Sequence, residues 1–263
     1  MTKKILIIGI IIGILVLVVP VLADYYQSND LNSNIAINSV KNFIQNSDEN
    51  LKIVDTKTTY QTTYYIVHSN NAEYYIDEST GNVAVAFFFN SLNNSKNIQL
   101  SLSEGENIAY NYALVHYPQF SQKNMILTSE NVYNYGDQGY EYEFIWNEII
   151  NKAKTPNLIV IDVNPQNGEI ITYVGLDSVI TIDIPQYPPI SKEKAIEIAQ
   201  QEAINSSMSP VSADLRVWYT KPNLQTLFWQ IEFCGMDDEG NIEGAIVQID
   251  AINGDIICYD PYL

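Results

Sequence analysis

Residues 248–256 read QIDAINGDI, in which an apolar strand leads to Asp250, three further residues, Gly254 and the start of a second strand. An Asp at the first position of such a turn accepts hydrogen bonds from the backbone N–H groups just ahead of it. Glycine supplies the positive φ that the chain needs where it enters the next strand. The stretch therefore predicts a tight β-hairpin.

The same pattern occurs twice more, at residues 75–83 (YIDESTGNV) and at residues 162–170 (DVNPQNGEI). Each copy has an Asp or Asn four residues before a glycine: Asp77 and Gly81, Asn164 and Gly168, Asp250 and Gly254. Successive glycines are 87 and 86 residues apart, and near-equal spacing of one turn pattern indicates duplicated units. We expect these residues to be structural turn residues. An acidic ligand site at Asp77 or Asp250 is the alternative interpretation.

Each hairpin follows a segment in which apolar residues have helical spacing. In the second copy Ser103 and Glu106 form a capping-box pattern, and in the third copy Ser191 is the expected N-cap of a helix with an alanine stripe. Runs rich in β-branched and aromatic residues lie between each helix and its hairpin. The sequence therefore predicts an α+β fold, made of repeated units of one helix packed on a roughly four-stranded antiparallel sheet.

Three such units are expected, at residues 30–90, 101–176 and 189–263. An Asn- and Ser-rich stretch at 90–97 separates the first two units, and a proline-rich stretch at 183–189 separates the last two. Units of 61 to 76 residues are marginally stable alone. We therefore expect them to pack together.

The third unit resembles the PepSY domain, a small extracytoplasmic α+β module. Residues 191–199 (SKEKAIEIA) are similar to the opening helix of that family, and residues 247–256 (VQIDAINGDI) are similar to its closing hairpin. The second unit is similar with Asn164 in place of Asp, whereas the first lacks the alanine-rich helix face. The resemblance implies an exported, non-enzymatic module, as found in propeptides of thermolysin-like peptidases and in standalone envelope proteins. It brings no catalytic residues, and the function it implies is peptidase inhibition or regulation.

Residues 1–23 are expected to be a targeting segment. Two lysines precede an apolar run, and Pro20 and Ala23 follow it, which is the layout of a cleaved signal peptide. Residues 5–23 are also long enough to span a bilayer as an uncleaved N-terminal membrane anchor. Both interpretations place the chain from Asp24 onward outside the cytoplasm, secreted or anchored. The membrane is then contacted only through this segment, if it is uncleaved.

Composition excludes several classes of function. With 13 Lys and Arg against 31 Asp and Glu, the formal net charge is −18, which argues against a nucleic-acid partner because phosphate neutralisation needs a basic surface. Two His and two Cys leave little material for a zinc site. Neither a His-Glu-x-x-His nor a Gly-x-Ser-x-Gly motif occurs, so no attached metallopeptidase or serine nucleophile is predicted. We therefore expect no catalytic residues, no metal and no cofactor.

The two cysteines are expected to be free thiols. In a simple meander, Cys234 would pair near Ala245 and Cys258 near Ile246, on opposite neighbours of one strand. Two strand spacings amount to about 9.6 Å, which exceeds the limit of about 7 Å between the Cα atoms of a disulfide. The expected export of the chain favours a disulfide between them instead, because disulfides persist in oxidising compartments.

Four further features have ordinary interpretations. His116 at a helix end and His68 beside a turn are expected to be structural. The acidic stretch at 237–243 lacks the order and length of a calcium-binding loop, so weak or no binding is expected. Asn93 and Asn205 stand in Asn-x-Ser sequons and are candidate glycan acceptors if the host glycosylates.

Two classes of function follow from the sequence. The first is a non-catalytic binding or regulatory module of the cell envelope, whose partner is an envelope protein or a peptidase. The second is an envelope hydrolase whose site is assembled from acidic and tyrosine residues outside any motif. The repeated units and the missing catalytic motifs favour the first class, and an activity screen against peptides and glycans separates the two.

Overall fold

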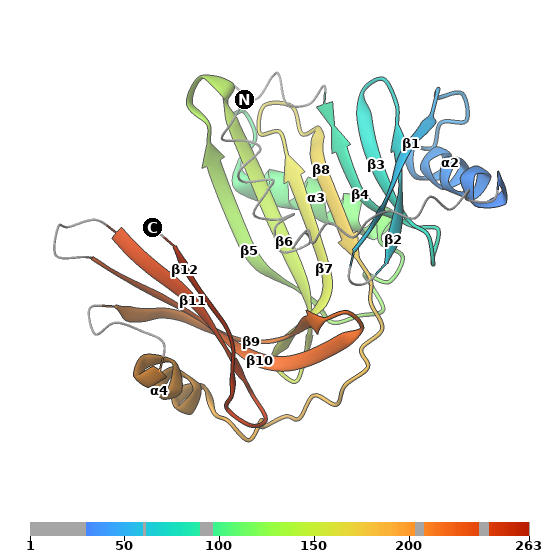
Figure 1. Ribbon diagram of the computed structural model, residues 1–263. Helices are drawn as coiled ribbons and strands as arrows, with labels where there is room; N and C mark the ends of the chain where they lie inside the picture. The colour runs from blue at the N-terminus through green and yellow to red at the C-terminus, as the bar shows by residue number, and fades with distance from the viewer. Residues whose placement is uncertain (1–29, 60–61, 90–96, 203–207, 237–241, 263) are drawn as a thin grey trace. The chain divides into compact units, whose positions relative to one another are not determined.

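The computed structural model describes residues 30–59, 62–89, 97–202, 208–236 and 242–262 (Figure 1). Helices alternate with groups of mostly antiparallel strands, which confirms the α+β class. The chain divides into two compact units, residues 1–92 and residues 93–263. The targeting segment expected at residues 1–23 lies outside the described residues. Within the described ranges, no helix combines the length and the apolar character that a membrane span requires.

The first unit contains α2 (Asp30–Ile44) followed by β1 (Lys52–Thr58), β2 (Thr63–His68), β3 (Ala72–Asp77) and β4 (Val83–Phe88). The four strands pair antiparallel in chain order. Ala36 and Val40, one helical turn apart on α2, are buried. Phe43 packs edge-on against Tyr74 of β3, with ring centroids 6.3 Å apart. The apolar stripe of α2 therefore covers one face of this sheet.

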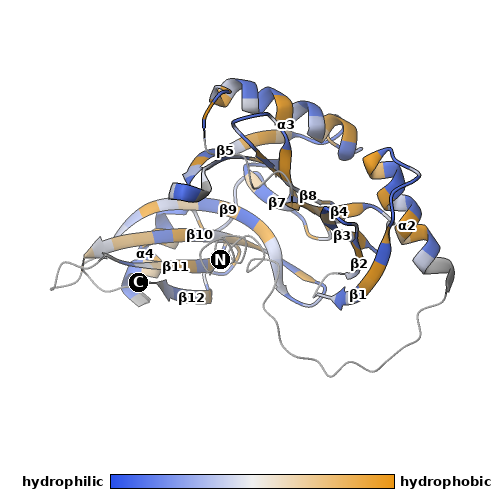
Figure 2. Ribbon diagram, turned by 90° about the horizontal axis from the view of Figure 1, so that it is seen from above, coloured by the Kyte–Doolittle hydropathy of each residue, from blue (hydrophilic) through white to orange (hydrophobic). Residues whose placement is uncertain are grey.

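The second unit begins with α3 (Leu102–His116), β5 (Met125–Asn134), the short 3-10 helix η2 (Gly136–Gln138), β6 (Tyr140–Ile150), β7 (Ala153–Val163) and β8 (Ile170–Leu176). These four strands also pair antiparallel in chain order. Figure 2 shows α3 lying along one face of them. The small residues Gly105, Ala109 and Ala113 are buried on the inner side of the helix. They leave room for the aromatic rings of β6, since a Cβ atom at Gly105 would lie 2.7 Å from the Tyr142 ring.

Helix α3 starts two residues before the predicted capping box, so that prediction is wrong in position. Ser101 is the N-cap: its Oγ accepts from the Glu104 N–H at 3.3 Å, and the Glu104 carboxylate accepts from the Ser101 N–H at 2.8 Å. Ser103 and Glu106 have the same spacing, and the two patterns overlap in the sequence SLSEGE. In the structure the first of the two patterns forms the capping box, and Gly105, Ala109 and Ala113 lie on the buried side of the helix.

The chain ends with α4 (Lys192–Glu202), β9 (Ser209–Lys221), β10 (Leu224–Met236), β11 (Ile242–Asp250) and β12 (Ile256–Tyr262), the strands again antiparallel in chain order. Ser191 caps α4, since its Oγ accepts from the Lys194 N–H at 3.2 Å. The alanine stripe of α4 is buried in one apolar cluster with strand residues: Ala195, Ala199, Ile231, Phe233, Val247 and Ile249.

Residues 93–263 share a core that runs from β7 to the last four strands. Lys154 of β7 and Arg216 of β9 form a parallel strand pair. A buried apolar cluster joins both sides: Ala153, Ile184, Leu215, Val217, Leu227 and Ala251. Segments of this size are marginally stable alone. The shared cluster adds buried apolar surface both to the β5–β8 segment and to the β9–β12 segment.

Cys234 and Cys258 are free. They lie on β10 and β12, on opposite sides of β11, as the predicted meander requires. The register differs from the prediction, because Cys234 pairs with Gly244 and Cys258 with Gln248. A bulge between Gln248 and Ile249 shifts the last strand, which moves the two thiols further apart along the sheet.

Candidate functional site

The third turn uses its polar residues internally. Asp250 Oδ1 accepts hydrogen bonds from the backbone N–H groups of Ile252 at 2.7 Å and Asn253 at 3.2 Å. Gly254 has φ +85° and donates its N–H to the Asp250 carbonyl at 3.0 Å. A Cβ atom at Gly254 would lie 3.2 Å from Ile198 of α4. The turn therefore lies against the helix that precedes it.

The two earlier turns have the same construction. Asp77 Oδ1 accepts from the N–H groups of Ser79 at 2.8 Å and Thr80 at 3.1 Å, and Asn164 Oδ1 accepts from the Gln166 N–H at 2.9 Å. The glycines Gly81 and Gly168 have φ +71° and +78°. These carboxylate and amide oxygens accept hydrogen bonds from backbone N–H groups of their own turns.

Asp250→Ala is expected to lower the free energy of unfolding by about 1 kcal/mol, because it removes both turn hydrogen bonds. Asp250→Asn keeps an acceptor oxygen, as Asn164 does in the second turn, and should stay within about 0.5 kcal/mol of the parent chain. Urea unfolding of both variants measures the difference. Equal losses would show that the charge of Asp250, rather than its hydrogen bonding, supports the turn.

The two histidines contact neighbouring side chains. His68 Nε2 lies 2.6 Å from a carboxylate oxygen of Glu73 on the neighbouring strand. The His116 ring packs on the Tyr112 ring with centroids 4.0 Å apart, and burial lowers the pKa of this histidine. Both sequons, at Asn93 and Asn205, lie outside the described residues, as does most of the acidic stretch at 237–243. Across the described part of the chain, no three His, Cys, Asp or Glu side chains are grouped so as to hold a metal ion.

A row of acidic side chains crosses the β5–β8 strands on the face that points away from α3. Glu143 of β6 is paired directly with Asp162 of β7, and Glu141 lies two residues before Glu143 on the same face. Asn131 of β5 and Thr172 of β8 occupy the two ends of the row. Glu143 is 2% exposed and Asp162 is 5% exposed. We call Glu141, Glu143 and Asp162 the acidic row.

Neutral donors contact the acidic row. The Asn131 amide donates to Glu143 Oε1 at 2.9 Å, and the Tyr133 hydroxyl donates to the same oxygen at 3.0 Å. Tyr135 donates to Glu141 Oε1 at 3.4 Å, and its ring is stacked beside that of Tyr133. Asp162 hydrogen-bonds to the Thr172 side chain, but its Oδ1 is buried without a hydrogen-bond partner.

Burial sets the electrostatics of this row. It raises the pKa of Asp162 well above its ordinary value, and the charges of Glu141 and Glu143 raise that pKa further, while Thr172 opposes the shift. Burial also raises the pKa values of Tyr133 and Tyr135, and the charge of Glu143 adds to the shift at Tyr133 while that of Glu141 adds to the shift at Tyr135. The tyrosines therefore remain neutral donors, and Asp162 retains its proton to a higher pH than an exposed aspartate.

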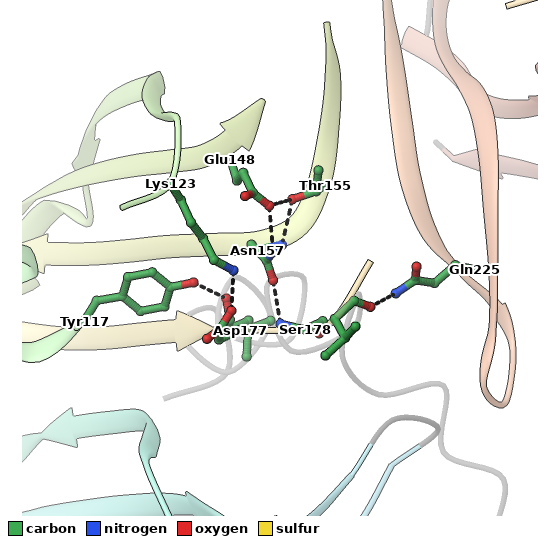
Figure 3. A network of polar contacts seen from close by, with 10 residues as sticks. Tyr117, Lys123, Glu148, Thr155, Asn157, Asp177, Ser178 and Gln225 are labelled. Atoms are coloured by element: carbon green, nitrogen blue, oxygen red, sulfur yellow. Dashed lines mark hydrogen bonds and ion pairs between the residues drawn. The ribbon is translucent and has the colours of Figure 1, made fainter. Parts of the chain in front are cut away.

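A second polar network lies where β8 leads into the segment 177–191, which connects it to α4 and which we call the linker (Figure 3). The buried Glu148 carboxylate accepts from Thr155 at 2.9 Å and from the Asn157 amide at 2.7 Å. The Asn157 carbonyl oxygen accepts from the Ser178 N–H at 2.5 Å, which ties the network to the linker. Further along, Gln225 of β10 accepts from the Thr181 N–H at 2.8 Å and donates to the Val179 carbonyl at 2.8 Å.

Lys123 and Tyr117 extend this network on the other side of the linker. Lys123 forms an ion pair with Asp177, and the Tyr117 hydroxyl donates to the Leu176 carbonyl at 3.1 Å. The linker is thus bonded to β7, to β10 and to the segment after α3. These contacts fix the course of the linker between β8 and the last four strands.

The acidic row could have been found in the sequence only in part. Residues 140–146 read YEYEFIW, and the two-residue period of a strand places both glutamates on one face. Asp162 interrupts the apolar run LIVIDV at 158–163. Its position opposite Glu143 depends on the strand register, which shifts at a bulge between Asn147 and Ile149. No local pattern encodes that shift.

Comparison with known proteins supports the resemblance for the end of the chain. Residues 189–257 match the family described as "Peptidase propeptide and YPEB domain" (PepSY), which confirms the family predicted from the helix and the hairpin. A similar solved structure is the Bacillus megaterium YpeB C-terminal domain, with 17% sequence identity and a TM-score of 0.48. The similarity covers 88% of this chain and 97% of that chain. No curated protein matches the sequence significantly.

Proposed function

We propose that this chain, whose residues 189–257 match the PepSY family, is a non-catalytic binding module of the cell envelope that regulates a peptidase or another envelope protein. The family match is the observation that carries the proposal, because its description names a peptidase propeptide. The expected export through residues 1–23 supports an extracytoplasmic location, either secreted or anchored.

We further infer that the three helix-and-four-strand segments are copies of one unit. Each has a helix, then four antiparallel strands in chain order. Each has its turn glycine at positive φ between the last two strands. A Cβ at that glycine would meet an isoleucine near or within the same segment's helix: Ile35, Ile108 and Ile198. Shared packing at equal spacing supports duplication more strongly than the turn pattern alone.

Strand β12 is an edge strand through which the module could bind a peptidase. Among the described strands, β12 pairs with β11 alone. Its residues 258–261 are exposed, and Tyr259 is 44% exposed. An extended edge of this kind can add to the strand-binding cleft of a peptidase without being cut. The exposed backbone would supply the hydrogen bonds, and Tyr259 would supply contact area.

The test is the rate at which a thermolysin-like envelope peptidase cleaves a reporter peptide in the presence of the full chain. We expect micromolar protein to slow cleavage, and Tyr259→Lys to weaken the inhibition by about tenfold, as loss of an aromatic contact can. Val132→Lys is the matched control, because Val132 is 49% exposed on another edge strand, β5. Unchanged peptidase activity with the parent chain would remove the peptidase proposal and leave the binding-module proposal standing.

The alternative, an envelope hydrolase, finds its best support in the acidic row. Glu143 and Asp162 face each other on neighbouring strands, and the pKa of Asp162 is raised, as in a general acid. Both carboxyls are nevertheless at most 5% exposed, which leaves little access for a sugar ring or a peptide backbone. We therefore expect no turnover of peptides or glycans. Turnover that Asp162→Asn abolishes would establish the hydrolase instead.

A further inference from the structure

The guanidinium of Arg216, the only arginine of the chain, has hydrogen-bond donors that the fold does not use. Its Nε is buried without a hydrogen-bond partner. Its Nη2 lies 3.8 Å from Asp214 Oδ2, which makes an ion pair but is too long for a hydrogen bond. Among the described residues, Asp214 is the one carboxylate that forms an ion pair with this guanidinium. Arg216 therefore has charge and donors to offer to a further acceptor.

Asp214 cannot satisfy Arg216, because Lys154 occupies the same oxygen. Lys154 Nζ donates to Asp214 Oδ2 at 2.7 Å, so two cations share one carboxylate oxygen. Burial disfavours ionisation of Asp214, but the three cations around it, Lys192 of α4 included, lower its pKa below the ordinary value. We call Lys154, Asp214 and Arg216 the cationic cluster. It is a locally positive place in a chain whose net charge is −18.

The missing counter-charge matters because Arg216 is partly buried. Burial lowers the pKa of Arg216, and the charge of Asp214 opposes that shift without cancelling it. A second anion would stabilise this cation, since hydrogen bonds between opposite charges are stronger than neutral ones. An anion bound at Arg216 accounts for both the excess charge and the unused donors.

The cationic cluster is accessible from solvent. The side chains of Lys154, Arg216 and Asp214 are 24%, 31% and 41% exposed. The buried atom of Arg216 is Nε, whereas Nη2 lies beside Asp214, the most exposed of the three. Lys154 and Arg216 are also the residue pair that joins β7 to β9, and Figure 1 shows these two strands meeting and then diverging. A ligand therefore reaches the cluster from the surface, without entering the core.

The chemistry of the cluster selects a carboxylate. A guanidinium presents parallel N–H groups that match the two oxygens of a planar carboxylate, and Lys154 adds a point charge beside them. One excess positive charge suits a monoanion. A phosphate dianion would bring a second negative charge close to Asp214, and like charges at such distances repel. A polyanion is disfavoured further by the net charge of −18.

We propose that Arg216, supported by Lys154, forms a binding site for a single carboxylate group, and that its occupant is a carboxylate of a protein partner, either an acidic side chain or a chain end. The proposal rests on the proposed function as a binding module and names a group that the module recognises. The carboxylate would accept from the terminal N–H groups of Arg216 and lie beside Lys154 Nζ. The partner would be neutral or basic overall, because the net charge of −18 repels an acidic one.

The test is a titration of the full chain with sodium acetate, followed by NMR, with sodium chloride at the same ionic strength as the blank. Because Arg216 is the only arginine, a ¹⁵N spectrum contains a single arginine Nε–H signal. We expect acetate to move this signal in a saturable manner and chloride to leave it in place. A signal that responds equally to both salts, or that never saturates with acetate, would overturn the site.

Two variants that keep the Arg216 signal should change the acetate affinity in opposite directions. Lys154→Gln removes an attracting charge and should weaken binding about threefold or more, whereas Asp214→Asn removes the repelling charge and should strengthen it by a similar factor. Lys221→Gln is the matched control, since it removes one positive charge from an exposed position five residues further along β9, and it should leave binding unchanged. Weaker binding in Asp214→Asn than in the parent chain would contradict the assignment of Arg216 as the binding group.

Peptides distinguish the two sources of the carboxylate. The same signal is followed with acetyl-Gly-Gly-Glu-Gly-Gly-amide and its glutamine counterpart, and with acetyl-pentaglycine bearing a free carboxyl end and its amide counterpart. A response to a carboxylate peptide that is absent with its neutral counterpart identifies the source, and a response to neither carboxylate peptide would overturn the proposal. Inorganic phosphate that binds about tenfold more tightly than acetate would overturn the choice of a carboxylate.

The site and the peptidase proposal can fail separately. Saturable acetate and peptide binding without any effect on peptidases would keep the site and remove the peptidase proposal. Inhibition of a peptidase by a chain whose Arg216 signal ignores every carboxylate would remove the site alone.

Discussion

Gly168→Val is expected to lower the free energy of unfolding by about 2 to 4 kcal/mol, which is a large part of the stability of a typical domain. Two effects add at this position. Gly168 has φ +78°, where a β-branched residue is strained, and its added Cβ would lie 2.8 Å from Ile108 Cδ1 on α3. Either the turn or the helix must move. Thermal unfolding of the full chain, followed by circular dichroism, measures the loss.

The control for this prediction is Gly136→Val. Gly136 also has a positive φ, +63°, but a Cβ there would meet no atom within 4 Å. This variant carries the backbone strain alone and should cost about 1 to 2 kcal/mol. If Gly168→Val lowers the free energy of unfolding by no more than Gly136→Val does, α3 must move to make room for the added side chain. The turn glycine would then serve conformation only, rather than conformation and packing together.

The turns were predictable because their chemistry is local. Asp250 and Gly254 lie four residues apart, and each acts through bonds within those residues. The start of α3 was misplaced by two residues because two Ser-x-x-Glu patterns overlap in SLSEGE, and the local sequence does not distinguish them. The cysteine register was misplaced for a related reason. A bulge after Gln248 changes which residues face each other, and bulges have no reliable local pattern.

The pairing of Glu143 with Asp162 and the linker network could not be predicted, for a different physical reason. Glu143 and Asp162 are 19 residues apart in the sequence, and Asn157 and Ser178 are 21 apart. Their partners are chosen by strand register and by the course of the linker, which depend on the whole fold. Composition indicated an acidic protein rich in tyrosine. It could not indicate that one aspartate would be buried with an unpaired oxygen.

Asn157→Ala is expected to cost about 2 to 4 kcal/mol, because it removes one donor from the buried Glu148 carboxylate and the acceptor of the half-buried Ser178 N–H. Asn157 is 1% exposed and bridges the Glu148 carboxylate and the Ser178 N–H. Its loss leaves Glu148 with one fewer donor for a buried charge, and charged groups lose more than neutral ones. The linker is also released from β7 at Ser178. Hydrogen exchange at the Ser178 N–H should therefore speed up by more than the change in global stability explains.

Asn107→Ala is the matched control, since Asn107 is exposed on α3 and the same atoms are removed. It should change stability by less than about 0.5 kcal/mol and leave exchange at Ser178 as it was.

A double-mutant cycle of Asn157→Ala with Glu148→Ala measures whether the two residues act together, because residues in one network are expected to couple by about 0.5 to 3 kcal/mol. Additive losses would mean that Asn157 and Glu148 act independently. The linker would then be held by Gln225 and by the Lys123–Asp177 ion pair, and the last four strands would keep their place on β7 without the buried carboxylate.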